Sequence, residues 1–211
     1  MWVKICGNTN LEDARATVEA GADALGFIFA PSPRRISPRE AKKIIAELPE
    51  GVEKVGVFVN QKPEIILDTV ETAGLTGVQL HGDEGPRLAR TIGRTGIKVY
   101  KALSAAVLEN EADGFADAVD ALFVDAGSDK RRGGAGKLFD WDRAAPIVRL
   151  LRRKVNIVVA GGLEAGNVGR AIELFHPWGV DVVSGVEREP GKKDHEKVRA
   201  FVKAAKAAAQ A

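Results

Sequence analysis

The sequence is poor in the residues that mark several common protein classes. It has one cysteine in 211 residues, so no disulfide can form within the chain and a secreted disulfide scaffold is excluded. No apolar run approaches the roughly 20 residues that span a bilayer, and the first residues resemble a strand rather than the apolar core of a signal peptide. We therefore expect a cytoplasmic globular protein without a membrane partner.

An excess of charge of one sign is also lacking. The chain carries 31 basic and 29 acidic side chains, which gives a formal net charge of +2. Because nucleic acids and acidic membranes attract proteins largely through excess positive charge, this balance argues against both as partners.

What the sequence does contain is an eightfold alternation of short apolar runs with longer segments of helical period. The runs are rich in valine and isoleucine, which is typical of parallel strands covered on both faces. The expected strands are Val3–Ile5, Ala24–Phe29, Lys54–Val59, Gly77–Leu80, Ile97–Ala102, Ala121–Val124, Val155–Val159 and Val180–Val183.

The intervening segments carry helix start signals. Thr9 followed by Glu12 matches a capping box, as does Ser37 followed by Glu40, with Pro38 at the first helical position. Apolar residues at helical spacing follow both signals. The later helices are expected over Glu64–Thr72, Gly85–Ile92, Ala105–Ala118, Trp141–Leu151, Ala165–Phe175 and His195–Ala208.

Eight strand–helix pairs predict an α/β protein with one domain over residues 1–211, a single (β/α)₈ TIM barrel. Closure of the barrel leaves no unpaired strand edge, although an open doubly wound sheet remains the alternative. The longest irregular stretch is Asp125–Asp140, with a basic run at Lys130–Arg132 and glycines after it. A long loop in an otherwise economical barrel is more often functional than idle, so we expect it to cover a ligand.

Barrel enzymes place their sites at the carboxyl ends of the strands, which makes three residues candidates for proton transfer or ligand orientation. Cys6 is either a buried small hydrophobe or a thiolate acting as base or nucleophile. Asp125 either caps a turn or holds its proton near neutral pH as a general acid. His81 is expected to be structural or to orient a ligand.

Two glycine-bearing turns predict a phosphate site. Gly161 and Gly162 follow the seventh strand and Ser184 and Gly185 follow the eighth. Backbone amides in such turns, with a helix N-terminus, can bind phosphate oxygens, whereas the alternative is that these glycines only form tight turns.

Three further charged residues are candidates for ligand binding. Arg34 and Arg35 either form a solvated loop or supply a guanidinium that pairs with a carboxylate or phosphate. Asp181, within the last strand, must be paired if buried, and it is either structural or orients the ligand.

Several motifs, taken in order along the chain, resemble phosphoribosylanthranilate isomerases. They are Lys4-Ile-Cys6-Gly7, Val78-Gln-Leu-His81-Gly82, Gly133-Gly-Ala-Gly136 with Phe139-Asp-Trp141, Ala160-Gly-Gly162, and the run from Val182 through Glu187 and Pro190 to His195. The resemblance spans nearly the whole chain and implies a barrel of the ribulose-phosphate-binding type.

The resemblance also implies a reaction and roles for particular residues. Members of the family convert N-(5-phosphoribosyl)anthranilate to 1-(2-carboxyphenylamino)-1-deoxyribulose 5-phosphate in tryptophan biosynthesis, without metal or organic cofactor. Cys6 falls on the position of the general base and Asp125 on that of the general acid. Arg34 matches the arginine that holds the anthranilate carboxylate, and the two glycine turns match the phosphate cradle.

Related barrels are the main alternatives. Indole-glycerol-phosphate synthase and the isomerases of histidine biosynthesis bind similar phosphates, but the histidine-type enzymes carry an aspartate where Cys6 stands. A barrel that only binds a phosphorylated metabolite is the non-enzymatic alternative, which turnover would exclude.

Apolar residues near the rim suggest association. Exposure to water would be unfavourable for the apolar side chains of Phe29, Phe58 and Trp2. Apolar surface of this kind is often covered by a twofold partner. We expect a homodimer on this basis, with packing of these residues under their own loops as the alternative.

Overall fold

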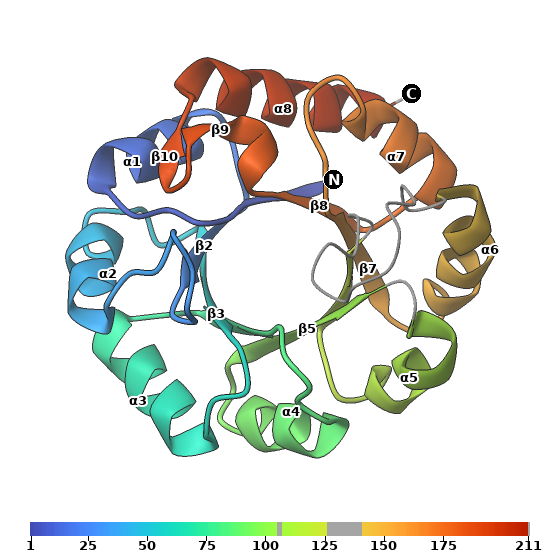
Figure 1. Cartoon of the computed structure of the whole chain (residues 1–211), viewed down its shortest axis with the longest axis horizontal. Helices are drawn as coiled ribbons and strands as arrows, with labels where there is room; N and C mark the ends of the chain where they lie inside the picture. The colour runs from blue at the N-terminus through green and yellow to red at the C-terminus, as the bar shows by residue number, and fades with distance from the viewer. Residues whose placement is uncertain (105–106, 126–140, 211) are drawn as a thin grey trace.

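The computed structural model describes residues 1–104, 107–125 and 141–210. Within them lies a closed barrel of eight parallel strands in chain order, in which β1 pairs with both β2 and β8. Figure 1 looks along the barrel, with the helices arranged around the strands. The (β/α)₈ barrel predicted from the alternating pattern is therefore confirmed.

The barrel strands match the expected runs to within two residues at each end. They are β1 Trp2–Ile5, β2 Ala24–Ile28, β3 Glu53–Phe58, β4 Gly77–Leu80, β5 Lys98–Ser104, β6 Ala121–Asp125, β7 Asn156–Ala160 and β8 Gly179–Val182.

The helices follow the strands one by one. They are α1 Leu11–Glu19, α2 Pro38–Ile45, α3 Pro63–Ala73, α4 Pro86–Gly93, α5 Leu108–Phe115, α6 Trp141–Leu151, α7 Val168–Phe175 and α8 His195–Ala208. Two expected helices begin too early: α5 starts at Leu108 rather than at residue 105, and α7 starts at Val168 rather than at residue 165.

One of the two predicted capping boxes is confirmed. The Ser37 hydroxyl accepts from the Glu40 amide, and the Glu40 carboxylate accepts from the Ser37 amide. The box predicted from Thr9 and Glu12 is wrong, because Asn10 caps α1 through the Asp13 amide. The Thr9 hydroxyl instead donates to the carbonyl of Gly191, so a tertiary hydrogen bond replaces the local one.

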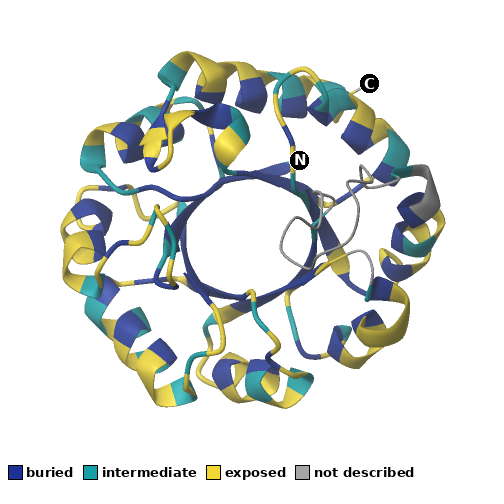
Figure 2. Cartoon of the chain, in the orientation of Figure 1, coloured by how far each residue is buried: buried dark blue, intermediate teal, exposed yellow. Residues whose placement is uncertain are grey.

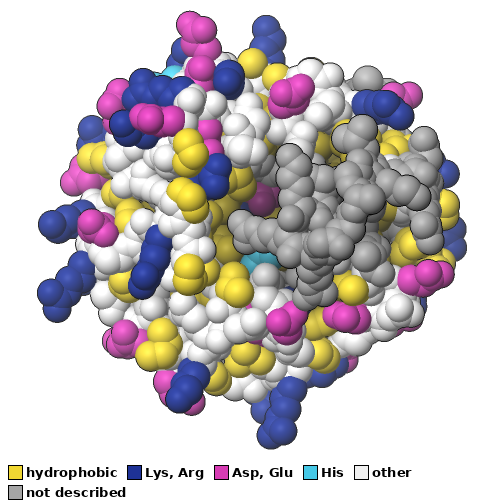
Figure 3. Space-filling model, in the orientation of Figure 1, with side chains coloured by type: hydrophobic (Ala, Val, Ile, Leu, Met, Phe, Trp, Pro, Cys, Tyr) yellow, Lys and Arg dark blue, Asp and Glu magenta, His cyan; other side chains and the backbone are white. Residues whose placement is uncertain are grey.

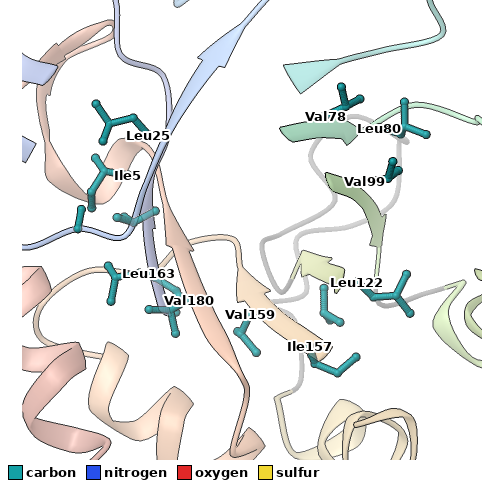
Figure 4. Close-up of a cluster of buried hydrophobic side chains, with 14 of the residues drawn as sticks. Ile5, Leu25, Val78, Leu80, Val99, Leu122, Ile157, Val159, Leu163 and Val180 are labelled. Carbon is teal, nitrogen blue, oxygen red and sulfur yellow. The ribbon is translucent and has the colours of Figure 1, made fainter. Parts of the chain in front are cut away.

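The apolar core has two parts because strand side chains alternate between the two faces of the sheet. Residues such as Leu25, Leu122 and Ile157 point outwards and pack against the helices, as the close-up in Figure 4 shows in part. Figure 2 shows the helices buried on the side that faces the barrel and exposed on the other. A second cluster, which includes Trp2, Tyr100 and Phe123, fills the amino-terminal end of the barrel interior.

The same alternation fixes what lies above that aromatic layer. In β1, Trp2 belongs to the interior cluster, Val3 and Ile5 face the helices, and Lys4 and Cys6 follow Trp2 inwards at steps of two residues. The barrel interior therefore changes from aromatic at its base to ionic and then to a thiol near the carboxyl ends of the strands.

The aromatic residues used to predict a dimer are buried within the chain. Phe29 and Phe58 are stacked with their ring centroids 5.3 Å apart, and Trp2 stacks on Trp178 at 5.0 Å. The packing alternative is thus correct for these side chains, and they give no support to association. Within the described ranges, no helix is long and apolar enough to cross a bilayer.

Candidate active site

Cys6 lies directly beyond β1, at the carboxyl-terminal mouth of the barrel. Its amide donates to the Val182 carbonyl (2.9 Å), and its own carbonyl accepts from the Lys193 ammonium (2.5 Å). The thiol packs on the bare backbone of Gly26, where an added Cβ would lie 2.4 Å from Sγ. The cysteine is therefore held from three neighbouring segments of the barrel.

Burial raises the pKa of the Cys6 thiol, because the thiolate loses solvation away from water. The Lys4 ammonium opposes this effect, and Lys193 does so more weakly. Lys4 in turn forms a buried ion pair with Asp181, Nζ to Oδ1 3.0 Å, and lies 5.2 Å from the centre of the Phe123 ring. Asp181 is thus paired, as its position in an apolar strand required.

Asp125 and His81 line a cavity of about 410 Å³ on the other side of the mouth. Asp125 ends β6 and His81 follows β4, so both side chains reach the mouth at the carboxyl ends of strands. In Figure 3 the mouth is the hollow near the centre of the view, with histidine and acidic side chains inside it.

The His81 imidazole is reached by solvent yet has protein around most of it. This partial withdrawal from water lowers the pKa of His81, while the negative charge of Asp125 acts in the opposite direction. A neutral imidazole beside a carboxyl group can accept or donate a hydrogen bond to a ligand in the cavity.

A buried pair of charges supports the turn that carries His81. Glu84 accepts from the amides of Asn60 and Gly82, each at 2.7 Å, and pairs with Lys101 at 3.1 Å. Lys101 also donates to the Gly82 carbonyl at 2.5 Å. These contacts fix the loops after β3 and β4 to β5, so the wall of the cavity is built from one connected polar network.

Arg34 lies on the Cys6 side of the mouth and is held by a carboxylate. Its Nε and Nη2 both donate to Glu187, with the shortest contact at 2.6 Å. This pairing raises the pKa of Arg34. The aliphatic part of the Arg34 side chain covers Gly7, where an added Cβ would lie 2.9 Å from Arg34 Cδ. Arg35, in contrast, is exposed.

The two glycine turns lie against each other. Gly161 and Gly162 have φ of 87° and 69°, a backbone conformation that favours glycine. The second turn forms a 3₁₀ helix over Ser184–Val186, and a Cβ at Gly185 would lie 1.9 Å from the carbonyl oxygen of Leu163. Gly162 and Ser184 are exposed at this junction, so solvent can reach both turns.

Sequence reasoning missed several charged residues that hold the site in place. They are Glu84, Lys101, Glu187 and Lys193, all of which are buried. Lys4 is buried as well, and the sequence indicated it only as a cation close to Cys6 on the same strand. Glu187 and Lys193 lie on a two-stranded hairpin, β9 Glu187–Glu189 and β10 Lys192–Lys193, that the eightfold pattern did not predict.

The predicted ligand cover at Lys130–Arg132, the glycines at 133–136 and residues 139–140 lie outside the described residues. Among the described residues, no three or more His, Cys, Asp or Glu side chains are grouped in a way that could hold a metal ion.

Side chains capable of proton transfer and candidate anion anchors thus meet at the carboxyl-terminal mouth of a parallel barrel, which defines the class of (β/α)₈-barrel enzymes. The family model for N-(5′-phosphoribosyl)anthranilate (PRA) isomerase matches residues 3–204. The chain belongs to this family, so the resemblance noted from its motifs is confirmed.

Individual relatives agree with the family model. The N-(5′-phosphoribosyl)anthranilate isomerases of Pelobacter propionicus and Rubrobacter xylanophilus are each 46% identical to this chain. The matches cover 97% of this chain in both cases, and 95% and 98% of the relatives.

Solved structures extend the similarity to three dimensions. The phosphoribosylanthranilate isomerase of Thermotoga maritima is 45% identical, with a TM-score of 0.88 over 98% of this chain and 99% of that one. Another, at 43% identity and a TM-score of 0.86 over the same shares of both chains, is a complex with reduced 1-(o-carboxyphenylamino)-1-deoxyribulose 5-phosphate.

Proposed function

We propose that this chain isomerises N-(5′-phosphoribosyl)anthranilate to 1-(2-carboxyphenylamino)-1-deoxyribulose 5-phosphate, with Cys6 as general base and Asp125 as general acid. The observation that carries the assignment of roles is the placement of a thiol and a carboxyl at one mouth, from β1 and β6. Membership of the isomerase family supports the reaction itself.

The chemistry needs an acid and a base that act on different atoms. An acid first protonates the ring oxygen of the ribose, so the C1–O bond breaks and the glycosylamine nitrogen forms an iminium with C1. A base then takes the proton from C2, which the iminium has acidified, and the electron pair of that C–H bond forms the enolamine. Tautomerisation gives the ketone, so no external oxidant or reductant is needed.

The remaining site residues are assigned to binding. Arg34 would pair with the anthranilate carboxylate, because it stands next to Cys6 while Arg35 is exposed. The junction of the turns at Gly161 and Gly162 with Ser184 and Gly185 would bind the phosphate. These two anchors would fix the two ends of the substrate and leave the reacting carbons between the proposed base and acid.

His81 would orient the bound substrate from the wall of the mouth, and Asp181 would act on it only indirectly, through Lys4. His81 lines the cavity beside Asp125, where a neutral imidazole can hydrogen-bond to a ribose hydroxyl. Asp181 is held by Lys4 below the thiol, so it would act mainly on the position of that ammonium.

The proposal is tested by turnover of N-(5′-phosphoribosyl)anthranilate, followed through its fluorescence. Wild type should consume the substrate, and the Cys6→Ala and Asp125→Asn variants should lose about 10²–10⁴ in kcat with unchanged circular dichroism. Wild-type-like turnover in either variant would remove that residue from the mechanism. Absence of turnover in the wild type would refute the activity.

Two further properties belong to the same proposal. A biosynthetic isomerase of this kind would work in the cytoplasm on a small phosphorylated molecule, without nucleic acid or membrane. A homodimer is supported by a relative, because the Thermotoga maritima enzyme is described as a dimeric phosphoribosylanthranilate isomerase. Sedimentation equilibrium at micromolar concentration tests this: the mass of one chain across the whole range would refute the dimer.

A further inference from the structure

The hairpin of β9 and β10 is an addition to the barrel that has no counterpart after the other seven strands in the described residues. It follows the 3₁₀ turn at Ser184–Val186 and precedes α8, with Gly191 at its tip in a left-handed conformation, φ 83°. Figure 1 places it beside α1 and α8, outside the ring of barrel strands. The hairpin lies within the terminal run from Val182 to His195, one of the motifs that resemble the family.

Two opposite charges of the hairpin are turned into the protein. Glu187 and Lys193 are cross-strand partners and both are buried, whereas Arg188, Glu189 and Lys192 are exposed. Burying charges costs free energy unless each finds partners, so these two side chains must be held by specific contacts.

Most of the hydrogen bonds that the Glu187 carboxylate accepts come from Arg34. The carboxylate accepts from Nε at 2.9 and 3.0 Å and from Nη2 at 2.6 Å, and it also accepts from the Gly191 amide at 3.2 Å. Burial alone would raise the pKa of Glu187, but Arg34 and Lys193 offset that and leave it below its usual range. The guanidinium is thus held by its Nε and Nη2 edge, and Nη1 takes no part in these contacts with Glu187.

Lys193 joins the same carboxylate to the cysteine. Its ammonium donates to Glu187 at 3.2 Å and to the carbonyl of Cys6 at 2.5 Å. Its backbone amide donates to Asp13, which also contacts His195 at 2.8 Å, so α1 and α8 both hold the hairpin. A continuous series of polar contacts therefore runs from Arg34 through Glu187 and Lys193 to Cys6.

We propose that Glu187 and Lys193 are a positioning pair that sets the place of the Arg34 guanidinium relative to the Cys6 thiol. The inference rests on the proposed roles of Arg34 as carboxylate anchor and Cys6 as base. Arginine has a long side chain with many rotamers, and an anchor that moves would bind substrate in geometries in which the C2 proton is out of reach of the base.

The pair predicts two different kinetic changes. Glu187→Gln removes the charge that holds Arg34, so KM should rise and kcat/KM should fall about 10- to 100-fold. Lys193→Met keeps the apolar stem and loses the hydrogen bond to the Cys6 carbonyl, so kcat should fall more than KM rises. Glu189→Gln on the exposed side of β9 and Arg35→Ala on the exposed loop are the controls, and both should behave as wild type.

A double-mutant cycle separates positioning from a structural role. If Glu187 acts through Arg34, then Glu187→Gln should cost little further kcat/KM in an Arg34→Ala background. Additive losses would overturn the coupling, and so would wild-type kinetics in Glu187→Gln. A wild-type-like Arg34→Ala would overturn the anchor role itself and the inference with it. The cycle is repeated with Glu187→Asp, so that a comparison remains if the glutamine variant does not fold.

Discussion

Lys4 and Asp181 are direct cross-strand neighbours in the barrel interior, and they form its central ion pair. They lie opposite each other in the register of β1 and β8, with Nζ and Oδ1 3.0 Å apart and both side chains buried. Cys6 follows Lys4 by two residues along the chain, so the ion pair lies one layer below the thiol in the barrel interior. Two charges of opposite sign whose positions the barrel fixes therefore act on the thiol, together with the weaker effect of Lys193.

This arrangement predicts the pH dependence of catalysis. If the thiolate is the base, kcat/KM should rise with pH through the pKa of Cys6 in the free enzyme, above the ordinary thiol value of about 8.5 because burial raises it. Lys4 lowers that pKa and Asp181 raises it. The rising limb should move to higher pH in Lys4→Met and to lower pH in Asp181→Asn. Shifts in the same direction, or none, would contradict a thiolate base.

The same pair predicts a loss of stability. Lys4→Met leaves the buried Asp181 carboxylate without its partner, which should lower the free energy of unfolding by about 3–5 kcal/mol. Lys4→Met with Asp181→Leu removes both charges and should recover part of that loss. Urea unfolding at pH 7 measures both variants, and the exposed pair of Lys192 with Glu189 supplies the control, since Lys192→Met should change stability little.

The sequence was enough to predict the barrel because its signals are local. Short valine-rich runs and capped helices repeat eight times, and strand ends point to Cys6 and Asp125 without further information. The supporting charges were not predictable in the same way. Arg34 and Glu187 are 153 residues apart in sequence, and Lys193 and Cys6 are 187 apart, so only the closed barrel brings them into contact.

The hairpin and the expected dimer show two further limits of prediction from the sequence alone. A lysine or glutamate in a polar run is normally solvated, so nothing in the sequence from 187 to 193 marks Glu187 and Lys193 as buried. Phe29 and Phe58 failed as indicators of association because apolar residues near a strand end can stack on each other as readily as on a partner.

Two buried carboxylates predict how the fold responds to acid. Burial alone would raise the pKa of Asp13, but the Lys193 amide, Asn10 and His195 stabilise the carboxylate and leave the pKa low; Glu187 behaves likewise. Carboxylates whose pKa is lower in the folded state stabilise it above their unfolded values, about 3.9 and 4.3, and lose that contribution as pH falls through the folded values.

Stability should therefore decline below about pH 4, more steeply in wild type than in variants that lack these charges. Asp13→Asn and Glu187→Gln should each be less stable than wild type at pH 7 and should lose less on going to pH 3. Thermal melting between pH 3 and 7 measures the effect. Glu19→Gln, at an exposed position at the end of α1, should follow the wild-type curve, and parallel curves for all four proteins would refute the assignment.

Gly26 provides the last test, because its missing side chain makes the room for the thiol. A Cβ at this position would lie 2.4 Å from Cys6 Sγ, closer than two unbonded atoms can approach, so Gly26→Ala must displace Cys6. Because proton transfer depends on the position of the base, kcat should fall at least about tenfold while the barrel remains folded. Gly93→Ala at the end of α4, where the nearest atom would be 3.8 Å away, is the matched control and should keep wild-type kcat.

The cause of that loss can be isolated by removing the sulfur. In a Cys6→Ala background the contact with Sγ is gone, so Gly26→Ala should cost less stability than it does in the wild-type protein, although the contact with Cβ at 2.9 Å remains. Its effect on kcat should also vanish there, since the base it displaces is absent. Thermal melting and the isomerase assay on the four proteins of this cycle provide the measurement. A fall in kcat of the same factor in both backgrounds would show that Gly26 serves the fold of β2 rather than the placement of the thiol.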